Sequence, residues 1–187
     1  PYLADHRLHD SMVFPGAAYV ETALAALNEL YPNEPYVIED VKILKALFMS
    51  GNDLINLQFF CDESDNSFKI YSSTDISSGE WDVHAEGRFQ KLSPRESGKL
   101  DLEHIKSTLE DEIDHAQIYS DFDDVGYQFG PCFKEVQKIW RKDGESLAEI
   151  QVPDAILENI DNYYFQPAVL DACFQGGKET RFKDEKR

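Results

Sequence analysis

Two histidines stand just ahead of a Pro-Gly pair and an apolar segment in the stretch DHRLHDSMVFPGAAYVE, residues 5–21. The imidazole of His6 or His9 has an unperturbed pKa of about 6.5, so it can take up or release a proton near neutral pH. A helix that begins at Pro15 and Gly16 would offer unpaired backbone N–H groups and the positive end of a helix dipole, which stabilise developing negative charge. The combination predicts proton chemistry on an activated acyl group, for which the rest of the chain must supply an acid.

The segment that follows predicts a buried helix and then a sheet. Apolar residues recur at helical spacing over residues 16–30, and Pro32 ends the pattern. The inward face is rich in alanine, so we expect another element to pack closely against it. Four strand candidates follow, in residues 36–49, 52–63, 67–74 and 81–92. One helix with a sheet wrapped around it predicts an α+β fold.

Residues 93–116 are polar, acidic and poor in apolar periodicity, so we interpret them as a linker with a short helix near His104–Leu109. The pattern resumes with a helix or loop at residues 115–126 and a hairpin around Asp143-Gly144. A second proline-led helix begins near Pro167 and repeats the layout of the first. The predicted organisation is a first half at 1–92, a linker at 93–116 and a second half at 117–187.

Composition disfavours several classes of function. The chain of 187 residues carries 36 acidic and 18 basic residues, and this formal net charge of -18 argues against nucleic acid and anionic membrane surfaces as partners. No apolar run reaches the roughly 20 residues of a membrane span. Charged residues near the start argue against a signal peptide, so we expect a cytoplasmic protein. The chain does not begin with methionine, which suggests a piece of a longer protein.

The opening stretch resembles the first motif of the dehydratase domains of modular polyketide synthases. That motif is a histidine, three residues, a glycine, four residues and a proline. His6 and Pro15 occupy its two ends, and Asp10 stands at the glycine position. The stretch WDVHAEGRF, residues 81–89, resembles the strand that ends the first half of this family.

Two further motifs of the same family follow in the expected order. The stretch GYQFGPCF, residues 126–133, resembles the family's Tyr-Gly-Pro-x-Phe segment, with Phe129 at the position of the tyrosine. Asp171 and Gln175 fit an Asp-x-x-x-Gln/His motif, with Gln166 where a histidine is usual. The resemblance therefore extends over nearly the whole chain.

The resemblance implies a double-hotdog fold, in which each of two long helices is wrapped by an antiparallel sheet and the active site lies between the halves. In that fold several strands follow the helix that carries Asp171, whereas this chain ends at residue 187. We therefore expect an incomplete second hotdog, whose helix would expose a large apolar patch.

The family's reaction is the dehydration of a β-hydroxyacyl thioester, which needs a base for the α-proton and an acid for the departing hydroxyl. A neutral His6 suits the first role. Asp171 suits the second, because its apolar neighbours favour the protonated form of a carboxyl group. Gln175, one helical turn later, would orient that carboxyl group, and the backbone N–H of Gly16 would bind the thioester carbonyl. The remaining residues that we expect to support the site or bind substrate are Pro15, Tyr127, Phe129, Gly130, Pro131 and Phe133.

Several of these residues also have simpler interpretations. Taken alone, His6 could be a capping or surface histidine, and Asp171 an acid that complements a helix dipole. His6 and His9 form an H-x-x-H pair, but no third ligand supports a metal site. We interpret His84 as a structural strand residue and Cys173 as a small core residue. The three cysteines, Cys61, Cys132 and Cys173, are expected to be reduced thiols, since they form no paired-cysteine motif.

Two departures from the family pattern bear on activity. Asp10 adds a carboxylate near His6, which would raise the pKa of the histidine and favour the wrong protonation state for a base. Phe129 lacks a hydroxyl that can help to line the family's pocket. Three functions stay open: a dehydratase, a double-bond isomerase or cyclase that uses the same His and Asp, and a catalytically silent scaffold domain.

The resemblance also implies partners. It implies no bound cofactor, since the substrate arrives on the phosphopantetheine arm of an acyl carrier protein, and it implies a neighbouring ketoreductase and a homodimer. Because carrier proteins are usually acidic, docking on this acidic chain needs a local basic patch or covalent tethering. The stretch WRKDG, Trp140–Gly144, is one candidate patch, and a solvated hairpin turn is its simpler interpretation.

Overall fold

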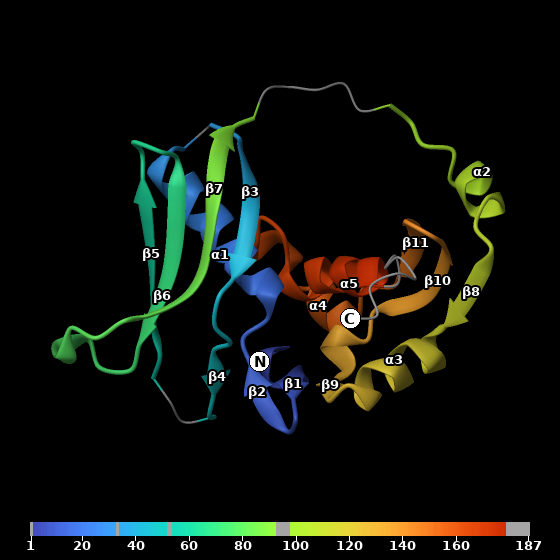
Figure 1. Ribbon diagram of the computed structural model, residues 1–187, viewed down its shortest axis with the longest axis horizontal. Coiled ribbons are helices and arrows are strands. Elements are labelled where there is room, and N and C mark those ends of the chain that lie inside the picture. Colours follow the sequence, from blue (N-terminus) through green and yellow to red (C-terminus); the bar gives the residue numbers. More distant parts are fainter. Residues whose placement is uncertain (1, 33, 52–53, 93–97, 179–187) are drawn as a thin grey trace. The chain divides into compact units, whose positions relative to one another are not determined.

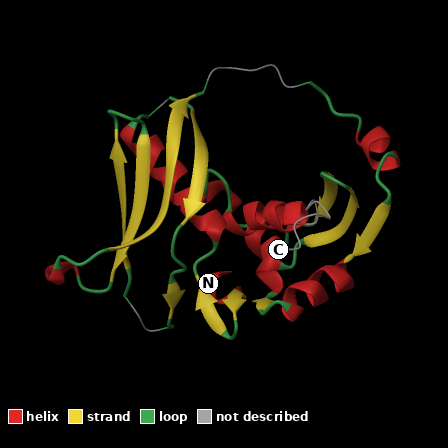
Figure 2. Cartoon of the chain, in the orientation of Figure 1, coloured by secondary structure: helices red, strands yellow, loops and turns green. Residues whose placement is uncertain are grey.

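The computed structural model describes residues 2–32, 34–51, 54–92 and 98–178, and the chain forms two compact units in it (Figures 1 and 2). Unit 1 contains residues 1–10, 95–160 and 168–187, and unit 2 contains residues 11–94 and 161–167. Each unit combines helices with antiparallel strands, as the predicted α+β class requires. None of the described helices is long and apolar enough to cross a bilayer.

The two units do not follow the predicted boundaries. Residues 1–10 belong to unit 1 and not to a first half at 1–92, because strand β1 (His6–Leu8) pairs with strand β9 (Tyr127–Phe129). The predicted linker at 93–116 contains helix α2 (Leu102–Ser107) and strand β8 (Asp111–Asp114). Only one side chain of β8 is buried, so its apolar pattern is too weak to distinguish it from a linker. Residues 93–97 of that linker, and residues 179–187, lie outside the described residues.

Unit 2 is built on helix α1 (Gly16–Leu30), which matches the predicted range. The helix buries a face that is rich in alanine, as expected, together with Tyr19 and Leu27. This face packs on one sheet of antiparallel strands in the order β3-β7-β6-β5. The strands are β3 (Tyr36–Ile43), β5 (Asn56–Asp62), β6 (Ser67–Ser73) and β7 (Asp82–Lys91), so each falls within a predicted strand segment. Short strands β2 (Ser11–Val13) and β4 (Phe48–Met49) pair with each other, and η2 (Ile76–Ser78) precedes β7.

His84 is a buried residue of β7, as predicted, and both of its ring nitrogens have partners. Its Nε2 lies 2.8 Å from Oγ of Ser72, and its Nδ1 lies 2.9 Å from the carbonyl oxygen of Lys45. Buried polar groups are stable when they are hydrogen-bonded in this way. The histidine therefore links β7 to β6 and to the loop after β3.

Glu21 is a buried acid of α1 whose carboxylate is well satisfied. It accepts hydrogen bonds from the backbone N–H groups of Tyr164 (3.0 Å) and Phe165 (2.7 Å). Hydrogen bonds to a charged acceptor are roughly twice as strong as neutral ones. Glu21 thereby fixes residues 161–167 to α1 within unit 2.

Unit 1 contains a sheet of antiparallel strands in the order β11-β10-β8 and the separate β1–β9 pair. Strands β10 (Val136–Lys142) and β11 (Glu145–Ile150) form the predicted hairpin around Asp143-Gly144. The segment predicted as a helix or loop is helix α3 (His115–Asp124), and the second proline-led helix is α5 (Pro167–Lys178). Short helical elements complete the chain: η1 (Tyr2–Asp5), η3 (Pro131–Phe133), α4 (Asp154–Leu157) and η4 (Ile160–Asn162). Apolar side chains of α3, β9, η3, β10 and α5 form the core of this unit.

Candidate active site

Strand β1 and helix α5 bring His6 and Asp171 together within unit 1. Nε2 of His6 lies 3.9 Å from Oδ1 of Asp171, and the two residues are only 6% and 8% exposed. The 3.9 Å separation is longer than a hydrogen bond, so the imidazole and the carboxyl group face each other without a direct one between these atoms. We expected the pair to come from opposite halves of the chain. It comes from one compact unit, because β1 pairs with β9.

Aromatic rings surround the imidazole of His6. Its ring centroid lies 4.9 Å from that of Phe133, 5.3 Å from that of Phe129 and 6.4 Å from that of Tyr127. Phe133 is fully buried and Phe129 nearly so. Three of the residues predicted to support the site therefore form an apolar wall that excludes water from the histidine.

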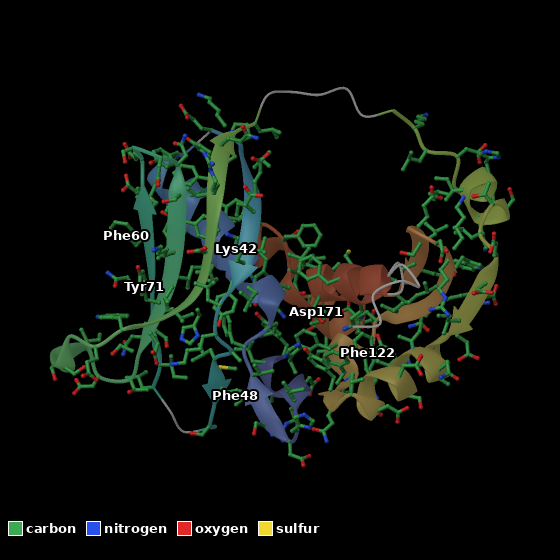
Figure 3. All side chains as sticks on the ribbon, viewed as in Figure 1. Lys42, Phe48, Phe60, Tyr71, Phe122 and Asp171 are labelled. Carbon is green, nitrogen blue, oxygen red and sulfur yellow. The ribbon has the colours of Figure 1, made fainter. Side chains whose placement is uncertain are left out.

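Asp171, labelled in Figure 3, lies on the buried face of α5, where burial favours the protonated form of a carboxyl group. Burial raises the pKa of Asp171, while the facing His6 and a hydrogen bond from Gln175 act in the opposite direction. The amide Nε2 of Gln175 donates to Oδ2 of Asp171 at 2.9 Å and to the carbonyl oxygen of Phe133 at 3.1 Å. Gln175 thus lies where the helical spacing predicted it, one turn after Asp171.

Tyr119 on α3 extends this network, and the sequence analysis did not identify it. Its hydroxyl donates to Oε1 of Gln175 at 3.0 Å and accepts the backbone N–H of Val136 at 3.1 Å. Gln175 is therefore held at both ends of its amide. The helical spacing of Ile118, Tyr119 and Phe122 in residues 115–126 was the signal that could have found it.

Asp5 is a second residue that the sequence analysis missed. Its carbonyl oxygen accepts the N–H of Gly130 at 2.7 Å, and its Oδ2 accepts the N–H of Cys132 at 3.0 Å. A Cβ atom at position 130 would overlap the carboxyl group of Asp5, so the close approach requires glycine. Pro131 begins η3 at this point. These contacts fix the turn against the residue that precedes His6.

Pro15 and Gly16 lie at the start of α1, as predicted, and belong to unit 2. Their expected contribution to substrate binding stays a prediction. Cys173 was predicted to be a core residue, but the structure has it exposed. It follows Asp171 by two residues, which on a helix places it on nearly the opposite side. In the described part of the chain, no group of three or more His, Cys, Asp or Glu side chains is arranged to hold a metal ion.

Two family models match the chain over most of its length. One, described as the polyketide synthase dehydratase domain, matches residues 1–73, and the other, described as the polyketide synthase dehydratase N-terminal domain, matches residues 97–178. The chain belongs to the polyketide synthase dehydratase family. The predicted resemblance is thereby confirmed.

The dehydratase chain is similar to parts of much longer proteins. It is 29% identical to the polyketide synthase GfsE of Streptomyces halstedii, over 92% of this chain and 5% of that protein. It is 30% identical to the phenolphthiocerol synthesis polyketide synthase type I Pks15/1 of Mycobacterium marinum, over 92% of this chain and 8% of that protein. The chain thus spans less than a tenth of the length of these curated relatives.

Solved dehydratase domains have the same fold. Those of the CurF and CurJ modules of the curacin polyketide synthase are each 28% identical to this chain, with a TM-score of 0.86 for both. The matches cover 98% and 100% of this chain and 67% and 64% of those chains. The predicted double-hotdog class is confirmed. Two CurK dehydratase structures, 27% and 28% identical with TM-scores of 0.82 and 0.80, are of inactive mutants, one histidine-to-phenylalanine and one aspartate-to-asparagine.

Asp10, which departs from the dehydratase motif, lies in the exposed turn between β1 and β2. Its φ of 63° is in the left-handed region, which explains why glycine suits this position. The backbone N–H of Asp10 donates to Oε1 of Gln128 at 2.7 Å, and Nε2 of Gln128 donates back to Oδ1 of Asp10 at 3.0 Å. The carboxylate that we expected to act on His6 is thus hydrogen-bonded to β9.

Asp10→Gly should leave the free energy of unfolding within about 0.5 kcal/mol of the wild-type value. The relief of left-handed strain offsets the lost hydrogen bond and the greater freedom of glycine in the unfolded chain. Asp10→Ala keeps the strain and loses the hydrogen bond, so it should cost about 1–2 kcal/mol. Urea unfolding of both variants measures the difference. Equal stability of the glycine and alanine variants would contradict the strained turn.

Proposed function

We propose that this dehydratase domain removes water from a β-hydroxyacyl thioester carried on the phosphopantetheine arm of an acyl carrier protein. The product is the α,β-unsaturated thioester. The observation that carries the proposal is the 3.9 Å approach of a buried imidazole, His6, to a buried carboxyl group, Asp171, whose pKa is raised by burial. The proposal requires no bound cofactor.

In the proposed reaction His6 is the base and Asp171 is the acid. The imidazole takes the α-proton, and the electrons of the broken C–H bond form the double bond as the C–O bond at the β-carbon breaks. Asp171 gives its proton to the departing hydroxyl, which leaves as water. Transfer of the proton from the imidazolium to the carboxylate, directly or through solvent, restores the starting state.

The surroundings of the pair support these roles. An acid that donates at neutral pH must be kept protonated, and burial favours that form of Asp171. Gln175 and Tyr119 hold the carboxyl group in one orientation, which contributes to catalysis by positioning. The relatives support the same assignment, since a histidine-to-phenylalanine and an aspartate-to-asparagine variant of a CurK dehydratase are inactive mutants.

We further propose an acyl carrier protein, a neighbouring ketoreductase and a second copy of this chain as partners, because the relatives are polyketide synthases. The candidate patch at Trp140–Gly144 does not support docking of an acidic carrier protein. Arg141 lies 3.8 Å from Asp111, and Lys142 lies 3.0 Å from Glu145, so nearby acids offset both of these cations. Covalent tethering of the carrier, which raises its effective concentration, is then the favoured means of delivery.

The test is to incubate the intact protein with a β-hydroxyacyl carrier protein and follow the acyl chain by mass spectrometry. Loss of water is expected. An unchanged mass would favour a silent scaffold domain and contradict the proposal. Chromatography of the released product then separates the α,β-alkene from a shifted alkene or a ring, which would indicate an isomerase or cyclase.

A further inference from the structure

Glu135 is a fully buried acid that the proposed reaction does not use. It is 0% exposed and lies between η3 and β10, two residues after Phe133. Among the described residues, neither oxygen of its carboxyl group has a hydrogen-bond partner. Glu21, the buried acid of unit 2, accepts two backbone N–H groups. An ionised carboxylate without such partners is strongly disfavoured, so the arrangement of Glu135 requires a different explanation.

Two of the groups that interact with Glu135, Asp171 and Tyr119, belong to the candidate site. Asp171 on α5 acts electrostatically on Glu135, and Glu135 in turn acts on Cys173 of α5 and on Tyr119 of α3. Cys132 of η3 is also within its influence. The neighbouring cation on its own segment is Lys134, whose Nζ lies 5.5 Å from the ring centroid of Tyr119.

The backbone beside Glu135 is connected directly to the acid of the site. The amide of Gln175 donates both to the carbonyl oxygen of Phe133 and to Asp171. Tyr119, which holds the other end of that amide, accepts the N–H of Val136, the residue after Glu135. Glu135 therefore lies between two residues whose backbone is hydrogen-bonded to the buried network around Asp171.

Two carboxyl groups in one dry region cannot both ionise readily, because the second negative charge is repelled by the first. Burial and the charge of Asp171 together raise the pKa of Glu135 to about 7. Gln175 and His6 both favour the ionised form of Asp171, which is the wrong form for an acid. The negative charge of a second carboxyl group, Glu135, favours the protonated form of Asp171 and so opposes this effect.

We propose that Glu135 is a positioning residue for the catalytic proton: the carboxyl groups of Glu135 and Asp171 share one proton, which keeps the acid available near neutral pH. The inference rests on the proposed function, in which Asp171 donates to the departing hydroxyl. Asp171 remains the group that touches the substrate. Glu135 acts only through it.

The first test is the pH profile of kcat in Glu135→Gln, which keeps the shape of the side chain and removes the charge. Without the shared proton, the alkaline limb should move to lower pH by about one unit, which is roughly a tenfold loss at pH 8. At pH 6, where Asp171 should hold its proton in both the variant and the wild type, kcat should stay within about twofold of the wild-type value. A limb that does not move, or an equal loss at every pH, would overturn the inference.

Glu149→Gln is the matched control, because it removes the same charge from an exposed position on β11. It should leave the alkaline limb where it is in the wild type. A similar shift in both variants would mean that overall charge, and not the buried pair, sets the profile, and it would also overturn the inference.

The second test does not depend on activity. In the intact protein labelled with carbon-13 at the glutamate carboxyl carbons, the resonance that Glu135→Gln removes should titrate near pH 7. In Asp171→Asn the same resonance should titrate at lower pH, because the neighbouring charge is gone. An ordinary glutamate pKa, or one that Asp171→Asn does not change, contradicts proton sharing. If the titration behaves as expected and no water is lost from substrate, the proposed function fails and the shared proton stands.

Discussion

Asp171→Asn should lower kcat for loss of water by about a thousandfold or more, because an amide has no acidic proton to give to the departing hydroxyl. The side chain keeps its size and can still accept the hydrogen bond from Gln175, so the fold should be preserved. Burial no longer opposes ionisation at this position, and the variant should be at least as stable as the wild type at pH 8. Single-turnover mass spectrometry measures the rate, and urea unfolding measures the stability.

Asp154→Asn is the control, since it makes the same change at an exposed position on α4 and should leave kcat unchanged. His6→Ala should be as inactive as Asp171→Asn. Because both residues act in one step of the proposed reaction, the double variant should lose little more than either single variant. If Asp171→Asn retains a tenth of the wild-type kcat, Asp171 is not the acid of this site.

The parts of the fold that the sequence predicted best are those with a strong local pattern. Helix α1 has a proline at each end and an unbroken apolar periodicity, so both of its limits followed from the sequence. Strand β1 has only three residues, and nothing in them indicates that they pair with β9, more than a hundred residues later. The membership of His6 in unit 1 therefore depended on a long-range pairing that local patterns do not contain.

The residues of the candidate site also divide into those that a sequence pattern predicted and those that depend on long-range contacts. His6, Asp171 and Gln175 followed from the resemblance to the family's motifs, and the structure brings all three together. Tyr119 and Asp5 contribute through hydrogen bonds to groups distant in sequence. The helical spacing of residues 115–126 indicates that Tyr119 is buried, but no local pattern indicates the partners of either residue. The other residues of the site could therefore be predicted from the sequence only where their spacing places them on one face of a helix or strand.

Glu135 was not accessible by that argument. Phe133 ends the short helix η3, and Glu135 follows it outside any helix or strand, so no periodic pattern predicts that both side chains are buried. A buried acid often has a function, because burial shifts its pKa. The sequence analysis followed the aromatic residues of this motif and not the acid after them.

Phe133→Ala should lower the free energy of unfolding by about 3–4 kcal/mol, because the ring is fully buried and its removal leaves a cavity. It should also lower kcat, since the ring packs 4.9 Å from the imidazole of His6 and 6.2 Å from Phe129. The backbone carbonyl of residue 133 stays in place for Gln175. The loss of kcat would therefore reflect the packing around His6, and not the hydrogen bond between the amide of Gln175 and the backbone of residue 133.

Urea unfolding of Phe133→Ala, Phe133→Leu and Phe60→Ala distinguishes the loss of core packing from the mere removal of a phenylalanine ring. Phe133→Leu fills most of the cavity and should recover more than half of the lost stability. Phe60, labelled in Figure 3, lies on β5 and is 53% exposed. Phe60→Ala should therefore cost about 1 kcal/mol or less. If the two alanine variants are equally stable, the ring of Phe133 does not pack in the core of unit 1. The imidazole of His6 would then lack the dry surroundings on which its proposed role as a base depends.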